Sequence, residues 1–116
     1  MADKVKTFLN QNQGVPFYLH VGSTYPHRAG KGFGNPREHA GIEPVPYQPA
    51  EIIVPNFLPD VPAVREDLAD YYESVSRYDQ VVGGVLNALE ASGRADETLI
   101  FVTTDHAMPF PGAKAS

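Results

Sequence analysis

The chain has 116 residues, of which 42% are hydrophobic, and a formal net charge of −5. This length allows at most one modest domain, and the hydrophobic content excludes a disordered chain. Because cysteine is absent, a disulfide scaffold, a thiolate metal site and a cysteine nucleophile are excluded within the chain. The acidic balance argues against a nucleic-acid partner, since phosphate binding needs a basic surface. We find no signal-peptide pattern and no apolar run near the roughly 18 residues of a membrane span.

The first part of the chain predicts a helix followed by a strand. Residues 2–12 place Val5, Phe8 and Leu9 on one face, and Gly14 suits the end of such a helix. Residues 16–22, "PFYLHVG", form an almost continuous apolar run, which is typical of a strand covered on both faces. We interpret His20 within this run as a structural residue rather than a ligand.

Residues 23–61 predict a long, irregular Pro/Gly-rich loop region. They contain seven of the 11 prolines and several glycines. A segment of this length without regular structure is uncommon in a compact domain, and it usually serves a function or is disordered. We therefore interpret residues 23–61 as an active-site loop region.

The clearest pattern follows from residue 62 to about residue 92, where apolar side chains recur every three or four positions and predict a long helix. Asp60 is a suitable N-cap, Pro62 suits the first turn, and Gly93 suits the end. Gly83 and Gly84 indicate either a close approach of another segment or a kink. Residues 98–104, "TLIFVTT", then predict a second strand.

The order of these elements predicts an α/β fold, in which a strand-helix-strand segment belongs to a mostly parallel, helix-covered sheet. Ligands of such sheets bind beyond the carboxyl ends of the strands. That rule selects "STYPHRAGKG" after the first strand and "DHAMPFPGAK" after the second. We therefore expect five side chains of these stretches to lie close together, namely those of His27, Arg28, Asp105, His106 and Lys114.

The chemistry of these residue types fits a hydrolase. Asp105 and His106 offer an oxygen and a nitrogen to a divalent cation. Arg28 and Lys114 offer positive charge to an oxyanion, and His27 can bind a substrate oxygen or protonate a leaving group. Together they predict hydrolysis of a sulfate or phosphate ester. Structural roles stay open as alternatives for each of these groups. Asp105 and His106 are then a polar turn that closes a strand, and Lys114 belongs to a solvated tail. His27 and Arg28 are then a pair that forms hydrogen bonds within the loop.

The stretches "PFYLHVGSTYPHR" and "YYESVSRYDQVVGGVL", together with the Asp-His pair before "PFPGAK", resemble the sulfatase family of the alkaline-phosphatase superfamily. The resemblance is nearest to the heparan N-sulfatase-like branch, and it runs from about residue 15 to the end. It implies that residues 1–116 form part of a single catalytic domain with an alkaline-phosphatase-like fold, incomplete as a domain.

The resemblance also implies roles for individual residues. Asp105 and His106 match metal ligands, and the family's usual ion is calcium. Lys114 matches a basic residue that contacts the sulfate, with Arg28 as a second substrate-binding residue. His27 matches an active-site histidine.

Two parts of the family pattern are absent from the sequence. Relatives carry a Cys/Ser-x-Pro-x-Arg cassette, whose first residue becomes the formylglycine nucleophile, and an earlier acidic pair that completes the metal site. "TYPHR", residues 24–28, only imitates the cassette, because threonine is not the residue converted. The sequence therefore predicts an internal fragment of a sulfatase that is inactive alone.

The resemblance implies a substrate class and a compartment. The expected substrates are sulfate esters or N-sulfates, with sulfated glycans as the family-level class, and the expected compartment is periplasmic, secreted or lysosome-like. We also expect self-association through exposed strand edges. Two alternatives stay open: a phosphate- or phosphonate-ester hydrolase of the same superfamily, and a non-catalytic remnant or binding module.

Overall fold

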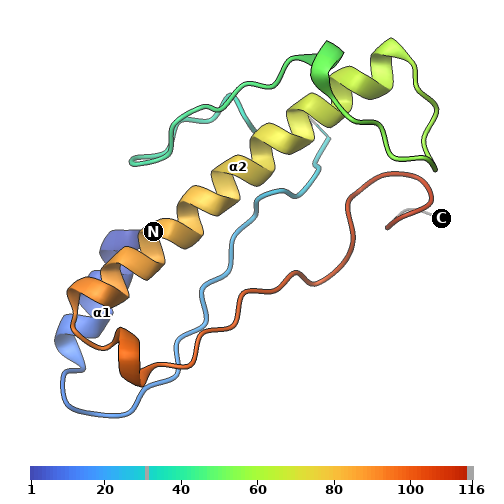
Figure 1. Cartoon of the computed structure of the whole chain (residues 1–116). Helices are drawn as coiled ribbons and strands as arrows, with labels where there is room; N and C mark the ends of the chain where they lie inside the picture. Colours follow the sequence, from blue (N-terminus) through green and yellow to red (C-terminus); the bar gives the residue numbers. More distant parts are fainter. Residues whose placement is uncertain (31, 115–116) are drawn as a thin grey trace.

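The computed structural model describes residues 1–30 and 32–114. These residues contain two α-helices, α1 (Ala2–Gln11) and α2 (Pro62–Ala91), and two short 3-10 helices, η1 (Pro49–Glu51) and η2 (Ala95–Glu97). The 30-residue α2 is the central helix of the molecule, and the other segments lie along it (Figure 1). Neither helix among the described residues is long and apolar enough to cross a membrane.

The ends of α2 follow from local chemistry. Pro62 occupies the first turn, where its missing N–H has no helical partner to lose. The predicted N-cap was wrong: Val61 is the N-cap, and the Asp60 carboxylate instead forms an ion pair with Arg65. Gly93 follows the helix with φ +72°, a left-handed conformation that favours glycine and confirms the predicted stop.

Two apolar clusters lie at different positions along α2. The first consists of Phe33, Ile52, Leu68, Ala69 and Phe110, and the second of Val5, Leu9, Ala88 and Leu89. The second joins α1 to the C-terminal part of α2. A Cβ on Gly84 would lie 3.4 Å from the Ala2 Cβ, which confirms the predicted close approach there, whereas a Cβ on Gly83 would meet nothing within 4 Å.

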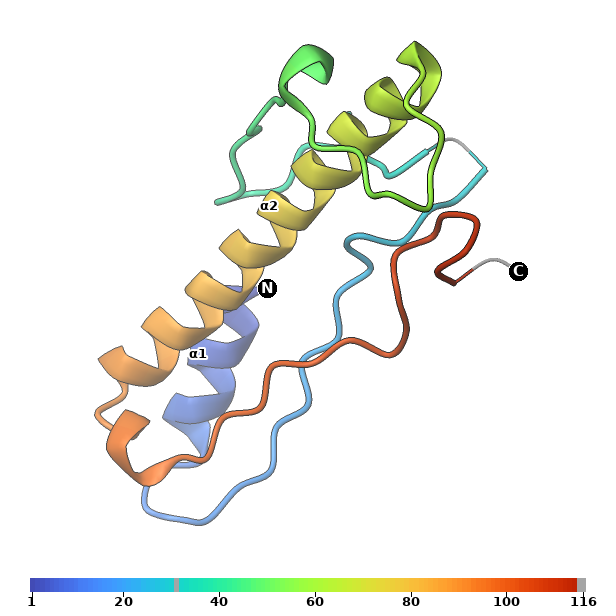
Figure 2. The same cartoon turned by 45° about the vertical axis from the view of Figure 1, so that its right-hand side comes forward.

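The predicted α/β fold with a strand-helix-strand arrangement was wrong, because the described residues contain no β-strand. Residues 16–22 and 98–104 run along the same side of the helices (Figures 1 and 2), but among the described residues no backbone hydrogen bond joins them. Phe17, Leu19 and Val21 pack against the second cluster, whereas Leu99 and Phe101 are 81% and 82% exposed.

The physical reason lies in what a parallel sheet needs. Such sheets are covered on both faces, and two strands alone are marginal in water. The described residues offer two extended segments and helices on one side only (Figure 2). The apolar runs at residues 16–22 and 98–104 therefore lack the partners that would make them strands, and the prediction of two strands was wrong.

Side chains of α2 form hydrogen bonds with the irregular region of residues 23–61 and hold it against the helix. Arg65 donates to the backbone carbonyls of three residues around η1, and Arg77 donates to the carbonyl of Arg37. The Gln80 side-chain amide pairs with both backbone groups of Glu43, and the Tyr47 hydroxyl bonds to the Ser76 hydroxyl. Polar side chains of α2 thus help to order the long loop, in which the described residues form only the short helix η1 as regular structure.

The molecule is elongated, with extents of 54 × 27 × 25 Å. Its radius of gyration of 17.0 Å exceeds the roughly 13 Å expected for a compact chain of this length. Its accessible surface of 8347 Å² likewise exceeds the roughly 6,200 Å² expected for a compact monomer of 12.6 kDa. The arrangement thus leaves more surface in water than a closed domain does.

Candidate functional site

The Asp-His pair lies on an exposed turn after the second extended segment. The Asp105 Oδ2 and His106 Nε2 atoms are 3.3 Å apart. The Thr104 hydroxyl donates to the His106 carbonyl over 2.7 Å, and the His106 Nδ1 lies 3.1 Å from the Ala107 carbonyl oxygen. Both side chains therefore present a polar atom at the surface, and the turn holds them next to each other.

The following segment, residues 108–114, forms a compact turn that we call the Pro-Phe turn. The Met108 carbonyl accepts hydrogen bonds from the N–H groups of both Phe110 and Lys114. Gly112 has φ +79°, and a Cβ there would lie 3.3 Å from the Phe57 ring, so the turn requires glycine. Phe110 is buried in the first apolar cluster and anchors the turn to α2, while Lys114 stays at the surface.

The His-Arg pair follows the first extended segment. A hydrogen bond of 2.7 Å from the His27 N–H to the Thr24 carbonyl closes a turn that leaves the His27 side chain exposed. Arg28 forms an ion pair with Asp67 of α2, and its guanidinium lies over the Phe33 ring. The hydrogen bond from Arg28 to Asp67 is the main reason why the pKa of Arg28 is raised.

The structure brings the two segments that carry the predicted site residues together at Arg28 and Phe110. The guanidinium of Arg28 lies 6.0 Å from the centre of the Phe110 ring, so the turn of residues 24–28, which we call the His-Arg loop, meets the Pro-Phe turn. Asp105 contacts His106. Within residues 1–30 and 32–114, however, no hydrogen bond or ion pair connects the side chains of His27 or Lys114 to this Asp-His pair.

The donors present fit a divalent cation only in part. Calcium takes six to eight oxygen ligands, and Asp105 with His106 supplies one carboxylate and one imidazole. The described part of the chain holds no group of three or more His, Cys, Asp or Glu side chains able to bind a metal ion. These residues therefore offer two ligands of a larger set and do not complete a calcium site by themselves.

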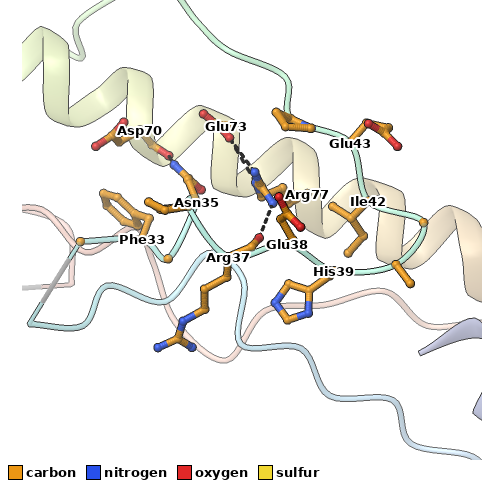
Figure 3. A pocket seen from close by; sticks show the side chains of 16 residues that line it. Phe33, Asn35, Arg37, Glu38, His39, Ile42, Glu43, Asp70, Glu73 and Arg77 are labelled. Carbon is orange, nitrogen blue, oxygen red and sulfur yellow. Dashed lines mark hydrogen bonds and ion pairs between the residues drawn. The ribbon is translucent and has the colours of Figure 1, made fainter.

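A pocket lies away from these turns. It has a volume of about 790 Å³ and is lined by residues 32–44 of the loop and by Asp70, Glu73 and Arg77 of α2. Figure 3 shows the Arg77 guanidinium directed at Glu73 and at the Arg37 backbone, while the Arg37 side chain extends away from α2. None of the predicted site residues lines this pocket, and the lining residues that the structure describes include no serine, threonine or lysine that could act as a nucleophile.

Sequence reasoning missed Asp67, the residue that engages Arg28. The two residues are 39 positions apart, and Asp67 is one of several acidic residues on α2. No local pattern marks one carboxylate on an amphipathic helix as the partner of a distant loop arginine. Only the folded arrangement identifies it.

The comparisons with known proteins agree with one another. A family model described as "Sulfatase" matches residues 1–114. The human N-sulphoglucosamine sulphohydrolase is 36% identical over 126 aligned positions, which cover 97% of this chain and 25% of that protein. An ulvan-active sulfatase of Formosa agariphila is 36% identical over 61 positions, which cover 53% of this chain and 10% of that protein. The chain thus spans about a quarter or less of the length of these relatives, and it belongs to the sulfatase family.

Proposed function

We propose that this chain works as part of a metal-dependent sulfatase that hydrolyses sulfate esters or N-sulfates. The observation that carries the proposal is the 36% identity to a sulphohydrolase of N-sulphated glucosamine over 97% of the chain. A second relative is named as active on ulvan. These two names favour a sulfated glycan as the substrate class.

The proposed roles follow the chemistry of the surface turns. Asp105 and His106 are two ligands of a divalent metal ion, with calcium as the first candidate, and further ligands come from outside the described residues. Lys114 contacts the sulfate group as a point charge. His27 donates a proton to the oxygen or nitrogen that leaves when its bond to sulfur breaks. When bound, the metal supplies positive charge to the developing sulfate oxyanion.

The proposal further assigns the nucleophile to a part of the enzyme outside this chain. The sequence contains no Cys/Ser-x-Pro-x-Arg cassette, so the chain alone should not turn over substrate. A purified sample is incubated with an aryl sulfate, an N-sulfated glucosamine and an aryl phosphate, with and without calcium. We expect no hydrolysis above that of buffer, and turnover of any of the three would contradict the assignment of the nucleophile.

The metal ligands can be tested on the chain itself. A calcium or manganese titration followed by NMR should perturb the amide signals of residues 104–108 first. Asp105→Asn should abolish this response, whereas the matched control Asp96→Asn, a change at an exposed acid on η2, should leave it intact. A response centred elsewhere, or one that survives Asp105→Asn, would refute the assigned ligands.

The catalytic roles need the sulfatase that contains this chain. There, His27→Asn should lower kcat for the sulfated substrate. His20→Asn is the matched control, because His20 is also exposed and lies in the extended segment just before the turn that carries His27. Activity greater on phosphate or phosphonate esters than on sulfates would favour the alternative hydrolase of the superfamily. Retention of full activity by His27→Asn would refute its role.

A further inference from the structure

Arg28 contacts one carboxylate and two aromatic rings of its own chain. Its guanidinium donates to the Asp67 carboxylate, and it lies 5.1 Å from the centre of the Phe33 ring and 6.0 Å from that of Phe110. The Arg28 and Asp67 side chains are 40% and 31% exposed, so the pair lies at the rim of the apolar cluster rather than in open solvent. A planar guanidinium is suited to this combination of carboxylate pairing and ring stacking.

The two rings connect Arg28 to the rest of the candidate site. Phe33 and Phe110 are buried in the first apolar cluster and stack on each other with centroids 6.3 Å apart. Phe110 belongs to the Pro-Phe turn, whose hydrogen bonds to the Met108 carbonyl also position Lys114. Arg28 also directly follows His27 in the sequence. One ion pair therefore fastens both the His-Arg loop and the Pro-Phe turn to α2.

The charges around Arg28 disfavour a second anion there. Asp67 already accepts its hydrogen bond, and the Asp70 carboxylate is close enough to act on it electrostatically. A sulfate that approached this guanidinium would have to displace one carboxylate and would be repelled by both. Lys114 and the exposed His27 have no such partners among the described residues.

We propose that Arg28 and Asp67 form a latch that positions His27 and the Pro-Phe turn, and that Arg28 does not bind the sulfate. This inference rests on the proposed function, because it concerns how His27 and Lys114 are presented to a sulfated substrate. Asp67 is a positioning residue that acts through Arg28. The latch also explains why loop and turn meet although residues 16–22 and 98–104 share no backbone hydrogen bonds.

The latch is tested first by amide hydrogen exchange. Asp67→Asn and Arg28→Lys should accelerate exchange at the Phe110 and Lys114 amides by about three- to tenfold, since a partly exposed ion pair and cation–π contacts are modest interactions. The control Arg37→Lys alters an exposed arginine of the loop. Exchange in α2 near residues 85–89 should stay unchanged. Unchanged exchange at the turn, or equal acceleration everywhere, would overturn the latch.

A second measurement separates positioning from direct binding. Inorganic sulfate is titrated while NMR follows the His27 ring and the Lys114 amide. If Arg28 bound sulfate, Asp67→Asn would release it and strengthen binding. The latch predicts the opposite: Asp67→Asn should weaken the response relative to Asp70→Asn, which removes the same charge three residues away and leaves the pair intact.

The two measurements fail in distinguishable ways. Stronger sulfate binding in Asp67→Asn than in Asp70→Asn would overturn the positioning role of Asp67. If the unmodified chain shows no response to sulfate at His27 or Lys114, the proposed sulfate site fails. In that case faster exchange in Asp67→Asn would still support the latch as the link between loop and turn.

Discussion

Replacing Arg77 with methionine tests whether buried polar contacts hold the loop on α2. The Arg77 side chain is 4% exposed, and its partner Glu73 is 17% exposed. The guanidinium donates two hydrogen bonds to the Glu73 carboxylate and one, of 3.1 Å, to the Arg37 carbonyl. Arg77→Met leaves a largely buried carboxylate without its partner and a loop carbonyl without its donor.

The expected cost follows from this geometry. Breaking a buried ion pair by removing one partner costs about 3–5 kcal/mol, and the partial exposure of Glu73 places this case at the lower end, about 3 kcal/mol. Because a domain of this size has about 5–15 kcal/mol of stability in total, the loss should be plain in a urea titration followed by circular dichroism. Arg37→Met, at an exposed arginine of the same loop, is the matched control and should change little.

A double-mutant cycle identifies the mechanism. Glu73→Gln in the Arg77→Met background removes the orphaned charge, so the double variant should be more stable than the sum of the single effects predicts, by about 1–3 kcal/mol. Additive effects, or a loss below about 1 kcal/mol for Arg77→Met, would refute the claim that this pair fastens the loop.

Four further outcomes are expected. Leu68→Ala should destabilise the chain by about 2–5 kcal/mol in urea unfolding, because Leu68 is 0% exposed; a loss under about 1 kcal/mol would contradict its place in the core. Gly83→Ala should raise the free energy of unfolding by about 0.5–1 kcal/mol, and Gly84→Ala by less, since only Gly84 approaches α1; equal gains would count against that approach. Desolvation, and then neighbouring carboxylates, raise the pKa of Asp70, so its ionisation opposes folding as pH rises through the raised pKa. Asp70→Asn should therefore stabilise the chain slightly at pH 7 and lose this advantage in acid; a gain that persists in acid would exclude the carboxylate as its cause. Phe101→Ser should reduce concentration-dependent association in analytical ultracentrifugation, because this ring is 82% exposed within an apolar run; a monomeric parent chain would refute this expectation.

The helices were predictable because their signals are local. The apolar spacing of α1 and α2, the proline in the first turn of α2 and the glycine after its last turn all act within a few residues. The observed bounds differ from the predicted ones by one residue at the end of each helix. The N-cap was mistaken because Asp60 has a competing partner, Arg65, that a capping pattern does not reveal.

The sheet was not predictable from the apolar runs alone. Residues 98–104 have the composition of a buried strand, yet a strand exists only when a neighbour satisfies its backbone groups. Among the described residues that neighbour is absent, and the side chains of Leu99 and Phe101 face water. The apolar composition of a segment indicates how much free energy its burial would contribute. It does not show whether a neighbouring strand is present to pair with its backbone.

The candidate site was predicted as a convergence of side chains from two segments. The structure brings these segments together at Arg28 and the Phe110 ring, and the convergence of the site side chains stays a prediction. The roles predicted for His27, Asp105, His106 and Lys114 stay predictions. The partner of Arg28 on α2 could not be foreseen, because an ion pair across 39 positions leaves no periodic trace in the sequence.

The DNA sequence that flanks this reading frame tests the proposed function most directly. Our account predicts an in-frame Cys/Ser-x-Pro-x-Arg cassette and an acidic pair upstream, which would supply the nucleophile and the remaining metal ligands. Stop codons that confine the frame to Met1–Ser116 would contradict it, because such a protein would have the sulfatase ancestry of this chain without the means to cleave a sulfate.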